Sequence, residues 1–430
     1  MKRAYVWVTV ALLAAFASAM VSDGLGAKEV VRPEEIKSWR QVVYDEQTYK
    51  KLTKLWKEYY SEYPSEYAYA NWMYAARYAK DEDYSKLLAK GVKRYPANPT
   101  LLYLKGLERL GATDDAEGRE YLERAAAMDP KYADPWFPIV THRMRARDEE
   151  RVDAALRRLA ESGVITDEVM DYNYNLLVGL EKDAILITNG DNDTYPGWIL
   201  TRIMNVRQDV SIVNRSLLNT EWYPMYVMER GLPRFIDKTE LTALRSSVIK
   251  AAKDKKGQVP PGGLFGDALI LKIVESAQRA DRPVYFSKTL FSSKELDPVM
   301  QSGRELGLVT LVTPSQTPYA EQLRKAYQTW LDTFRTAGLA SWRLKSSPRA
   351  DAGRMLVSNY AQGIVINLEA LKKDAPELRL KLFRWYIEHV EGILSDQMRH
   401  NTGQAWSCGA SDVKEIDAWR RQQGLECKKQ

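Results

Sequence analysis

The chain has 430 residues, too many for one ordinary hydrophobic core, so two or three domains are expected. Its 45% hydrophobic and 28% charged residues are typical of a globular protein that folds in water. The formal net charge of +6 is spread along the chain, and the longest basic cluster, residues 253–256, is short, which disfavours nucleic acid as a partner.

The first 19 residues predict a signal peptide. Lys2 and Arg3 precede an apolar run over residues 4–16, and residues 17–19 form a small-residue cleavage site. This run is shorter than the ~20 residues that span a bilayer, and no later segment is apolar enough to do so. We therefore expect a periplasmic or secreted protein without a transmembrane segment after signal cleavage, with an uncleaved anchor as the alternative.

Residues 33–180 predict a helical array of tetratricopeptide-like repeats. The dipeptides Tyr63-Pro64, Tyr95-Pro96 and Asp129-Pro130 lie 32 and 34 residues apart, close to the period of that repeat. About three helix pairs are expected, and each buries one face only by stacking on its neighbours. Most of the Tyr and Trp rings are expected to pack the repeats, while a few can line a groove for peptide or glycan.

Residues 183–314 predict a small Rossmann-like α/β domain. Four short runs have the pattern of strands buried on both faces: residues 184–188, 210–213, 283–286 and 308–312. Helical segments alternate with these runs, which predicts a parallel sheet. The expected fold class is therefore α/β plus all-α: a tetratricopeptide-like helical array, a small parallel-sheet domain, and C-terminal helices over residues 317–430.

Polar side chains follow three of the four predicted strands. In parallel sheets the carboxyl ends of the strands meet at one edge, where ligands commonly bind. We therefore predict one ligand-binding site, formed by Asn189, Asp191, Asn192, Asp193, Thr194, Asn214, Asn219, Glu221, Trp222 and Lys288.

The polar run over residues 189–194 allows different interpretations. Asp191 and Asp193 offer oxygen ligands to a hard cation such as Mg²⁺ or Ca²⁺. They can equally hydrogen-bond sugar hydroxyls, with Trp222 as a stacking face. The structural alternative is that Asp193 or Thr194 caps a helix expected over residues 197–207, and for Thr194 alone this cap is favoured. For the whole run a ligand role and a structural role stay equally open, and the metal is unspecified.

Other catalytic motifs are missing from the sequence. It contains no Gly-x-Gly-x-x-Gly or Walker loop, no His-Glu-x-x-His zinc site and no Gly-x-Ser-x-Gly nucleophile elbow. The three histidines, His142, His389 and His400, are scattered. We therefore assign no catalytic residue and expect no cofactor.

Cys408 and Cys427 are the only cysteines. In an oxidising compartment they are natural disulfide partners. Closing this loop contributes roughly 3 kcal/mol on the chain-entropy model.

The stretch Gly190-Asp191-Asn192-Asp193-Thr194-Tyr195-Pro196 resembles a motif in a family of bacterial and animal membrane proteins related to protein O-mannosyltransferases and largely of unknown function. Further matching segments are residues 207–210, 214–223, 282–286 and 306–309, and more weakly 359–361. In that family glycosyl transfer is assigned to a membrane-spanning half, which this sequence lacks, so no catalytic residue is carried over. The resemblance implies an extracytoplasmic module that recognises an acceptor or a carbohydrate.

Together these features predict an exported, non-catalytic binding or scaffold protein of the cell envelope. It would recognise a protein or glycan partner through the polar strand exits and the helical-repeat surface. The alternative is a metal-dependent hydrolase or a glycan-modifying transferase that uses Asp191 and Asp193. The sequence specifies neither the ligand nor the oligomeric state.

Overall fold

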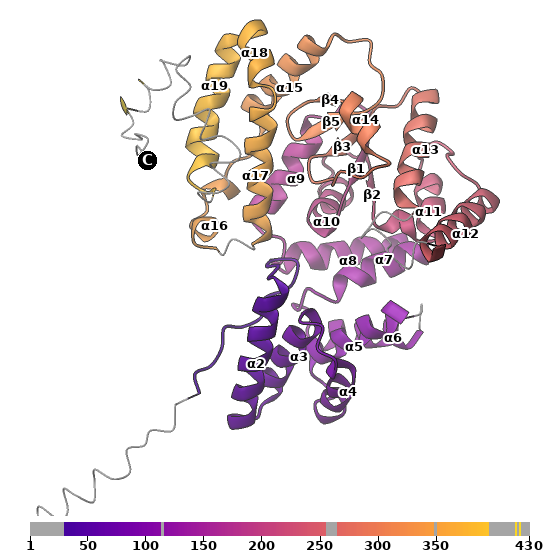
Figure 1. Ribbon diagram of the computed structural model, residues 1–430, viewed down its shortest axis with the longest axis vertical. Helices are drawn as coiled ribbons and strands as arrows, with labels where there is room; N and C mark the ends of the chain where they lie inside the picture. The colour runs from indigo at the N-terminus through magenta and orange to yellow at the C-terminus, as the bar shows by residue number, and fades with distance from the viewer. Residues whose placement is uncertain are drawn as a thin grey trace, which may run out of the picture. The chain divides into compact units, whose positions relative to one another are not determined.

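The computed structural model describes residues 30–112, 116–254, 265–347 and 351–394, together with 418, 421 and 422. The predicted signal peptide, residues 1–19, and the cysteines Cys408 and Cys427 lie outside these residues. The described chain consists of many helices and one five-stranded sheet, which confirms the expected combination of α/β and all-α parts (Figure 1). It forms two compact units. Unit 1 comprises the chain up to Ile36 with Asp45–Leu104, and unit 2 comprises Lys37–Tyr44 with the chain from Lys105 onward.

Unit 1 is helical. Asp45 and Ser65 cap two of its helices, because their side chains accept hydrogen bonds from the N–H groups of Thr48 and Ala68. Aromatic rings fill its core, and Trp56 is fully buried there. The helices are α2 (Glu46–Glu62), α3 (Glu66–Tyr78), α4 (Tyr84–Arg94) and the start of α5 (Pro99–Ala112).

After the end of α5, four whole helices of unit 2 precede its sheet in the described chain. The side chain of Asp148 caps the third of them by accepting a hydrogen bond from the N–H of Arg151. The helices are α6 (Ala116–Met128), α7 (Trp136–Arg145), α8 (Glu149–Glu161) and α9 (Asp167–Val178), and α7 packs against both α6 and α8. Whether α2 to α9 form tetratricopeptide-like repeats stays a prediction.

The sheet of unit 2 has the strand order β2-β1-β3-β5-β4. Strands β1, β2 and β3 are parallel, so Thr188, Asn214 and Ser287 end at one edge, as expected. The strands are β1 (Ile185–Thr188), β2 (Ser211–Asn214), β3 (Val284–Ser287), β4 (Arg304–Glu305) and β5 (Val309–Leu311). Figure 1 shows them in the middle of unit 2, with α17 and α19 on one side and α11, α12 and α13 on the other.

The expectation of an all-parallel sheet is wrong for β5, which runs antiparallel to both β3 and β4. The crossover from β3 leads instead into the two-residue strand β4, in a segment expected to be helical. Gly307, with φ +80°, then turns the chain back, and the N–H of Leu306 donates to the carbonyl of Val309 at 2.8 Å. The hairpin therefore places β5 between β3 and β4.

The helix after β1 begins earlier than expected. Helix α10 (Asp191–Trp198) starts directly after the strand exit and continues as a π-helix, η1 (Ile199–Ile203). Its N-cap is Gly190, so the preference for Thr194 as the cap is wrong. The cause is Asp193 at the third helical position, whose carboxylate accepts a hydrogen bond from the N–H of Gly190.

The remaining described elements complete unit 2. Buried aromatic rings of Trp330, Tyr360 and Trp385 pack together among the C-terminal helices. After β2 come η2 (Leu217–Asn219), α11 (Tyr223–Glu229), α12 (Lys238–Asp254) and α13 (Gly266–Arg279), and after β3 comes α14 (Asp297–Ser302). After β5 come α15 (Tyr319–Thr333), η3 (Gly338–Ala340), α16 (Trp342–Ser346), α17 (Ala352–Val365), α18 (Leu368–Asp374), α19 (Pro376–Tyr386) and η4 (Ile387–Glu391).

Among the described residues, no helix combines the length and the apolar character needed to span a membrane.

Candidate functional site

A buried hydrogen-bond network joins the exits of β1 and β2. The hydroxyl groups of Thr188 and Thr194 lie 2.7 Å apart, and the amide of Asn214 donates to Thr194 at 2.8 Å. The side-chain oxygen of Asn214 accepts from the N–H of Leu217 at 2.8 Å. All three side chains are buried, so Thr194 and Asn214 hold the strand ends together beneath the surface.

Asp193 is the central carboxylate of this region and is buried. Its two oxygens accept hydrogen bonds from the N–H groups of Asn189 at 2.7 Å and Gly190 at 2.8 Å, and Thr289 donates a further bond. Burial raises the pKa of Asp193, and these hydrogen bonds oppose that shift. The carboxylate thus orders the turn between β1 and α10.

A cavity of about 700 Å³, here called the exit cavity, opens above these strand ends. Five predicted residues line it: Asn189, Asp191, Asn192, Asp193 and Lys288. Its volume lies within the ~300–1,000 Å³ that is usual for ligand pockets. The structure therefore brings half of the predicted residues to one hollow.

The other walls of the exit cavity come from distant parts of unit 2. Trp39 and Arg40 belong to Lys37–Tyr44, and Met355, Asn359 and Gln362 belong to α17. A short antiparallel bridge between residues 42 and 351 fastens the first segment to the start of α17. Sequence reasoning missed these residues, and the only signal toward them was the weak family likeness around Asn359.

Charged groups in the exit cavity are mostly paired. The Nε of Arg40 lies 3.0 Å from the carboxylate of Asp191, and its guanidinium also stacks on the ring of Phe137 at 4.1 Å. The ammonium of Lys288 lies 2.8 Å from the carboxylate of Glu305. In the exit cavity, the positive charges of Arg40 and Lys288 are therefore already neutralised by neighbouring carboxylates.

Of the four side-chain amides that line the exit cavity, only that of Asn359 is paired within the described chain, because it donates to the hydroxyl of Tyr172 at 3.1 Å. The side chains of Asn189, Asn192 and Gln362 line it and have no hydrogen-bond partner among the described residues. Large apolar side chains surround them, and Trp39, Phe291 and Met355 are 38%, 71% and 48% exposed. The cavity thus combines neutral hydrogen-bonding groups with an apolar rim.

Five predicted residues lie outside this lining. Thr194 and Asn214 belong to the buried network described above, and the other three lie elsewhere. Asn219 accepts hydrogen bonds from the N–H groups at the start of α13, and Glu221 is exposed and paired with Arg245. The ring of Trp222 packs edge-on against Tyr223, at 5.4 Å between centroids. The expectation of Trp222 as a stacking face in this cavity is not met, because α11 starts there and its aromatic residues pack on one another.

A buried ion pair holds the backbone at Phe291, one of the apolar residues that line the exit cavity. The guanidinium of Arg215 donates two hydrogen bonds to the carboxylate of Asp267, at 2.7 and 2.6 Å, and a third to the carbonyl of Phe291 at 2.9 Å. Arg215 follows β2 and Asp267 lies in the first turn of α13. Local patterns in the sequence do not link Arg215 to Asp267, because the two residues lie 52 residues apart.

No cluster of three or more His, Cys, Asp or Glu residues suited to a metal ion occurs in the described ranges. The site is therefore a hollow at the carboxyl edge of a mixed sheet, in a chain of class α/β plus all-α. Residues 169–230 match the family model described as TMEM260-associated domain 2. This match runs from α9 to the end of α11 and fits a family related to TMEM260 and the O-mannosyltransferases. No curated protein matches the chain.

Proposed function

We propose that this chain is an exported, non-catalytic binding or scaffold protein of the cell envelope. In this proposal the exit cavity holds a protein or glycan partner, and its chemistry favours a glycan. The observation that carries the proposal is the set of unpartnered amides of Asn189, Asn192 and Gln362 beside the exposed ring of Trp39.

Amides and rings together suit a neutral sugar. Each amide offers two donors and one acceptor, which match the hydroxyl groups of a saccharide. The rings of Trp39 and Phe291 offer flat apolar surfaces for the C–H face of a sugar. The paired state of Arg40 and Lys288 removes the free charge that an anionic ligand would need.

The contacts of the two aspartates favour binding over the alternative, a metal-dependent hydrolase or glycan-modifying transferase. Asp193 accepts hydrogen bonds from two backbone N–H groups and Thr289, and Asp191 is paired with Arg40. A divalent cation would have to displace these donors, because it needs several oxygen ligands at once.

A direct test measures binding to the chain that lacks residues 1–19. The immobilised protein is exposed to neutral oligosaccharides, charged oligosaccharides and unmodified peptides, and retained ligands are then studied by calorimetry. We expect a neutral oligosaccharide to bind, and Trp39→Ala or Asn192→Ala to weaken it at least tenfold, about 1.4 kcal/mol. Trp342→Ala is the matched control, because Trp342 is 79% exposed and does not line the cavity.

Three outcomes would count against the proposal. Retention of peptides alone would exclude the glycan and leave the protein partner. Equal affinity of the Trp39→Ala variant would remove the exit cavity as the site. Stoichiometric Mg²⁺ or Ca²⁺ binding that disappears in Asp191→Ala would favour the enzyme.

The finer sequence predictions remain part of the proposal. We infer tetratricopeptide-like repeats over residues 33–180 and domain limits at 183–314 and 317–430. We also infer cleavage after residue 19, a periplasmic or secreted location, and a bond between Cys408 and Cys427. The proline spacing, the apolar N-terminal run and the cysteine count support them. Mass spectrometry of the exported chain, before and after reduction, tests both the cleavage and the disulfide.

A further inference from the structure

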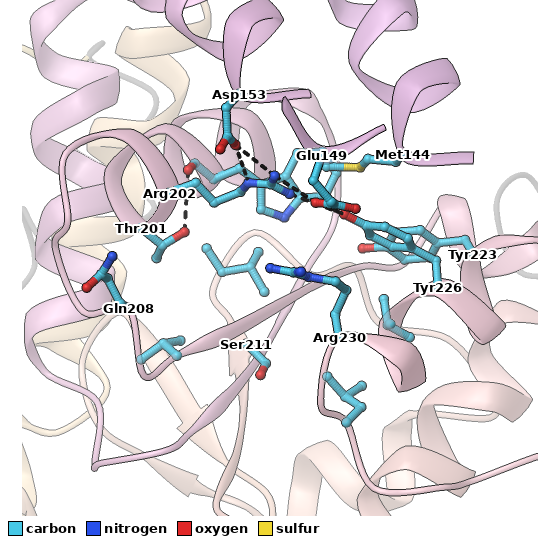
Figure 2. A pocket seen from close by; sticks show the side chains of 15 residues that line it. Met144, Glu149, Asp153, Thr201, Arg202, Gln208, Ser211, Tyr223, Tyr226 and Arg230 are labelled. Atoms are coloured by element: carbon cyan, nitrogen blue, oxygen red, sulfur yellow. Dashed lines mark hydrogen bonds and ion pairs between the residues drawn. The ribbon is translucent and has the colours of Figure 1, made fainter. Parts of the chain in front are cut away.

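A second cavity in unit 2, of about 350 Å³, shares no lining residue with the exit cavity. It lies between α8, the π-helix η1, the start of β2 and α11 (Figure 2). It therefore borders the amino end of β2, whereas the exit cavity borders the carboxyl ends of the parallel strands. We call it the Arg230 pocket.

One wall of the Arg230 pocket is acidic. Arg202 donates from Nε to Asp153 at 2.8 Å, from a terminal nitrogen to Glu149 at 2.8 Å, and from the other to the hydroxyl of Tyr226 at 3.2 Å. Two carboxylates thus share one guanidinium, and the group carries one net negative charge. About one third of each carboxylate side chain stays exposed, so both can accept further hydrogen bonds.

The central residue of this wall lies in a π-helix. Arg202 belongs to η1, where the wider helical turn replaces the regular α-helix. π-helices are rare and are frequent at functional sites. Figure 2 shows Arg202 directed toward Asp153 and Glu149, with dashed lines for their contacts.

The opposite pole is Arg230, whose guanidinium points into the pocket in Figure 2. Arg230 forms no ion pair within the ranges that the structure describes. Its neighbour Glu229 is already paired with Arg147 at 2.5 Å. The pocket thus has an unneutralised cation facing an acidic wall.

Apolar side chains also line the Arg230 pocket. They come from α7, α10, β2, α11 and the segment after α11: Met144, Trp198, Ile212, Val227 and Leu232. A ligand without apolar groups gains little binding free energy from such a lining, whereas a ligand with an apolar side chain gains binding free energy when that side chain is buried there. The ligand should therefore carry two opposite charges and one apolar group.

We propose that the Arg230 pocket binds a free amino acid with an apolar side chain. The ammonium group meets the carboxylates of Glu149 and Asp153, and the carboxylate meets Arg230. Charge-assisted hydrogen bonds of this kind are the stronger class in proteins. The site is independent of the proposed glycan site.

Calorimetry with L-leucine and L-phenylalanine tests the pocket in the chain that lacks residues 1–19. N-acetyl-L-leucine carries only the carboxylate, and L-leucinamide carries only the ammonium group. We expect leucine or phenylalanine to bind with a dissociation constant below about 1 mM. Each singly charged analogue of leucine should bind at least tenfold more weakly than leucine itself.

Single variants test which residue binds the carboxylate and which residue binds the ammonium group of leucine. Arg230→Gln should weaken leucine at least tenfold while leaving leucinamide unchanged, because only the carboxylate contact is lost. Glu149→Gln should weaken leucine while leaving N-acetyl-leucine unchanged. Arg234→Gln is the matched control, since Arg234 is exposed and does not line the pocket. Trp39→Ala should not affect leucine binding.

The proposal is overturned if neither amino acid binds, or if N-acetyl-leucine binds as tightly as leucine. Equal affinities of the wild type and Arg230→Gln would also overturn it. Thermal unfolding of each variant shows that it is folded. If Glu149→Gln does not fold, the exposed Arg230 still decides the outcome.

Discussion

The hydroxyl group of Thr289 donates a hydrogen bond to the carboxylate of Asp193, which joins the chain after β3 to the helix after β1. The same carboxylate accepts from the N–H groups of Asn189 and Gly190. One buried side chain therefore fixes the first turn of α10 and the spacing of two strand exits.

Asp193→Asn should lower the free energy of unfolding by about 2–3 kcal/mol. The single amide oxygen of asparagine cannot accept hydrogen bonds from all three donors, so at least one buried donor is left without a hydrogen bond. Urea unfolding measures this change. Asp191→Asn is the control and should cost less than about 1 kcal/mol, since its pair with Arg40 is partly exposed. Equal losses in the two variants would contradict the central role of Asp193.

The pair between Arg215 and Asp267 makes a second prediction. Arg215→Met should destabilise unit 2 by about 3–5 kcal/mol, because it leaves the fully buried Asp267 without a counter-charge. The double variant Arg215→Met with Asp267→Leu should recover most of that loss. Urea unfolding of both variants tests this, and a double variant as unstable as the single one would show that the charge is not the cause.

Close packing between two glycines makes a third prediction. A Cβ added at Gly363 would lie 2.7 Å from the carbonyl oxygen of Gly307 and 2.8 Å from its carbonyl carbon. Gly363→Ala should therefore cost about 1–3 kcal/mol of unfolding free energy, since backbone atoms must move. Gly179→Ala meets nothing within 4 Å and should be neutral or stabilise by about 0.4–1 kcal/mol. Thermal or urea unfolding distinguishes the two.

A pH dependence is expected from His142 in α7. Burial, and then the charges of Arg119 and Arg143, lower the pKa of His142 to about 4. An unfolded histidine has a pKa of about 6.5. As the pH falls through this window the unfolded chain binds a proton that the folded chain does not, so the free energy of unfolding decreases from about pH 6.5 to about pH 4.

His142→Gln should flatten the stability profile in that window, because glutamine does not titrate. Urea unfolding at several pH values measures the profile, and an NMR titration follows the histidine directly. An unchanged slope in the variant would assign the pH dependence to other groups.

Local patterns in the sequence predicted the strands well. The expected ranges for β1, β2 and β3 agree with the structure within about one residue at each end, because strands buried on both faces have an uninterrupted apolar pattern. The parallel arrangement of these strands, and hence the common edge of Thr188, Asn214 and Ser287, was also predictable.

Other features were not accessible to local patterns. The two-residue strand β4 is too short to show a periodicity, so the hairpin at Gly307 was missed and β5 was expected to be parallel. The start of α10 was missed because the polar residues after β1 resemble a loop until Asp193 is seen to accept from Gly190.

The candidate site was predictable on one side only. Asn189, Asp191 and Asn192 directly follow a strand, and their place at the edge follows from its direction. Trp39 and Gln362 line the same cavity although they lie more than 300 residues apart in the sequence. Contacts between such distant segments produce no hydrophobic periodicity, so a single sequence does not reveal them.

Unit 2 is discontinuous, because Lys37–Tyr44 belongs to it while the next residues, Asp45–Leu104, build unit 1. During synthesis this short segment emerges early, yet its strand partner at Asp351 is made near the end. The wall that carries Trp39 and Arg40 can take its place only after α17 exists. The lining of the exit cavity is therefore incomplete in any chain that ends before α17.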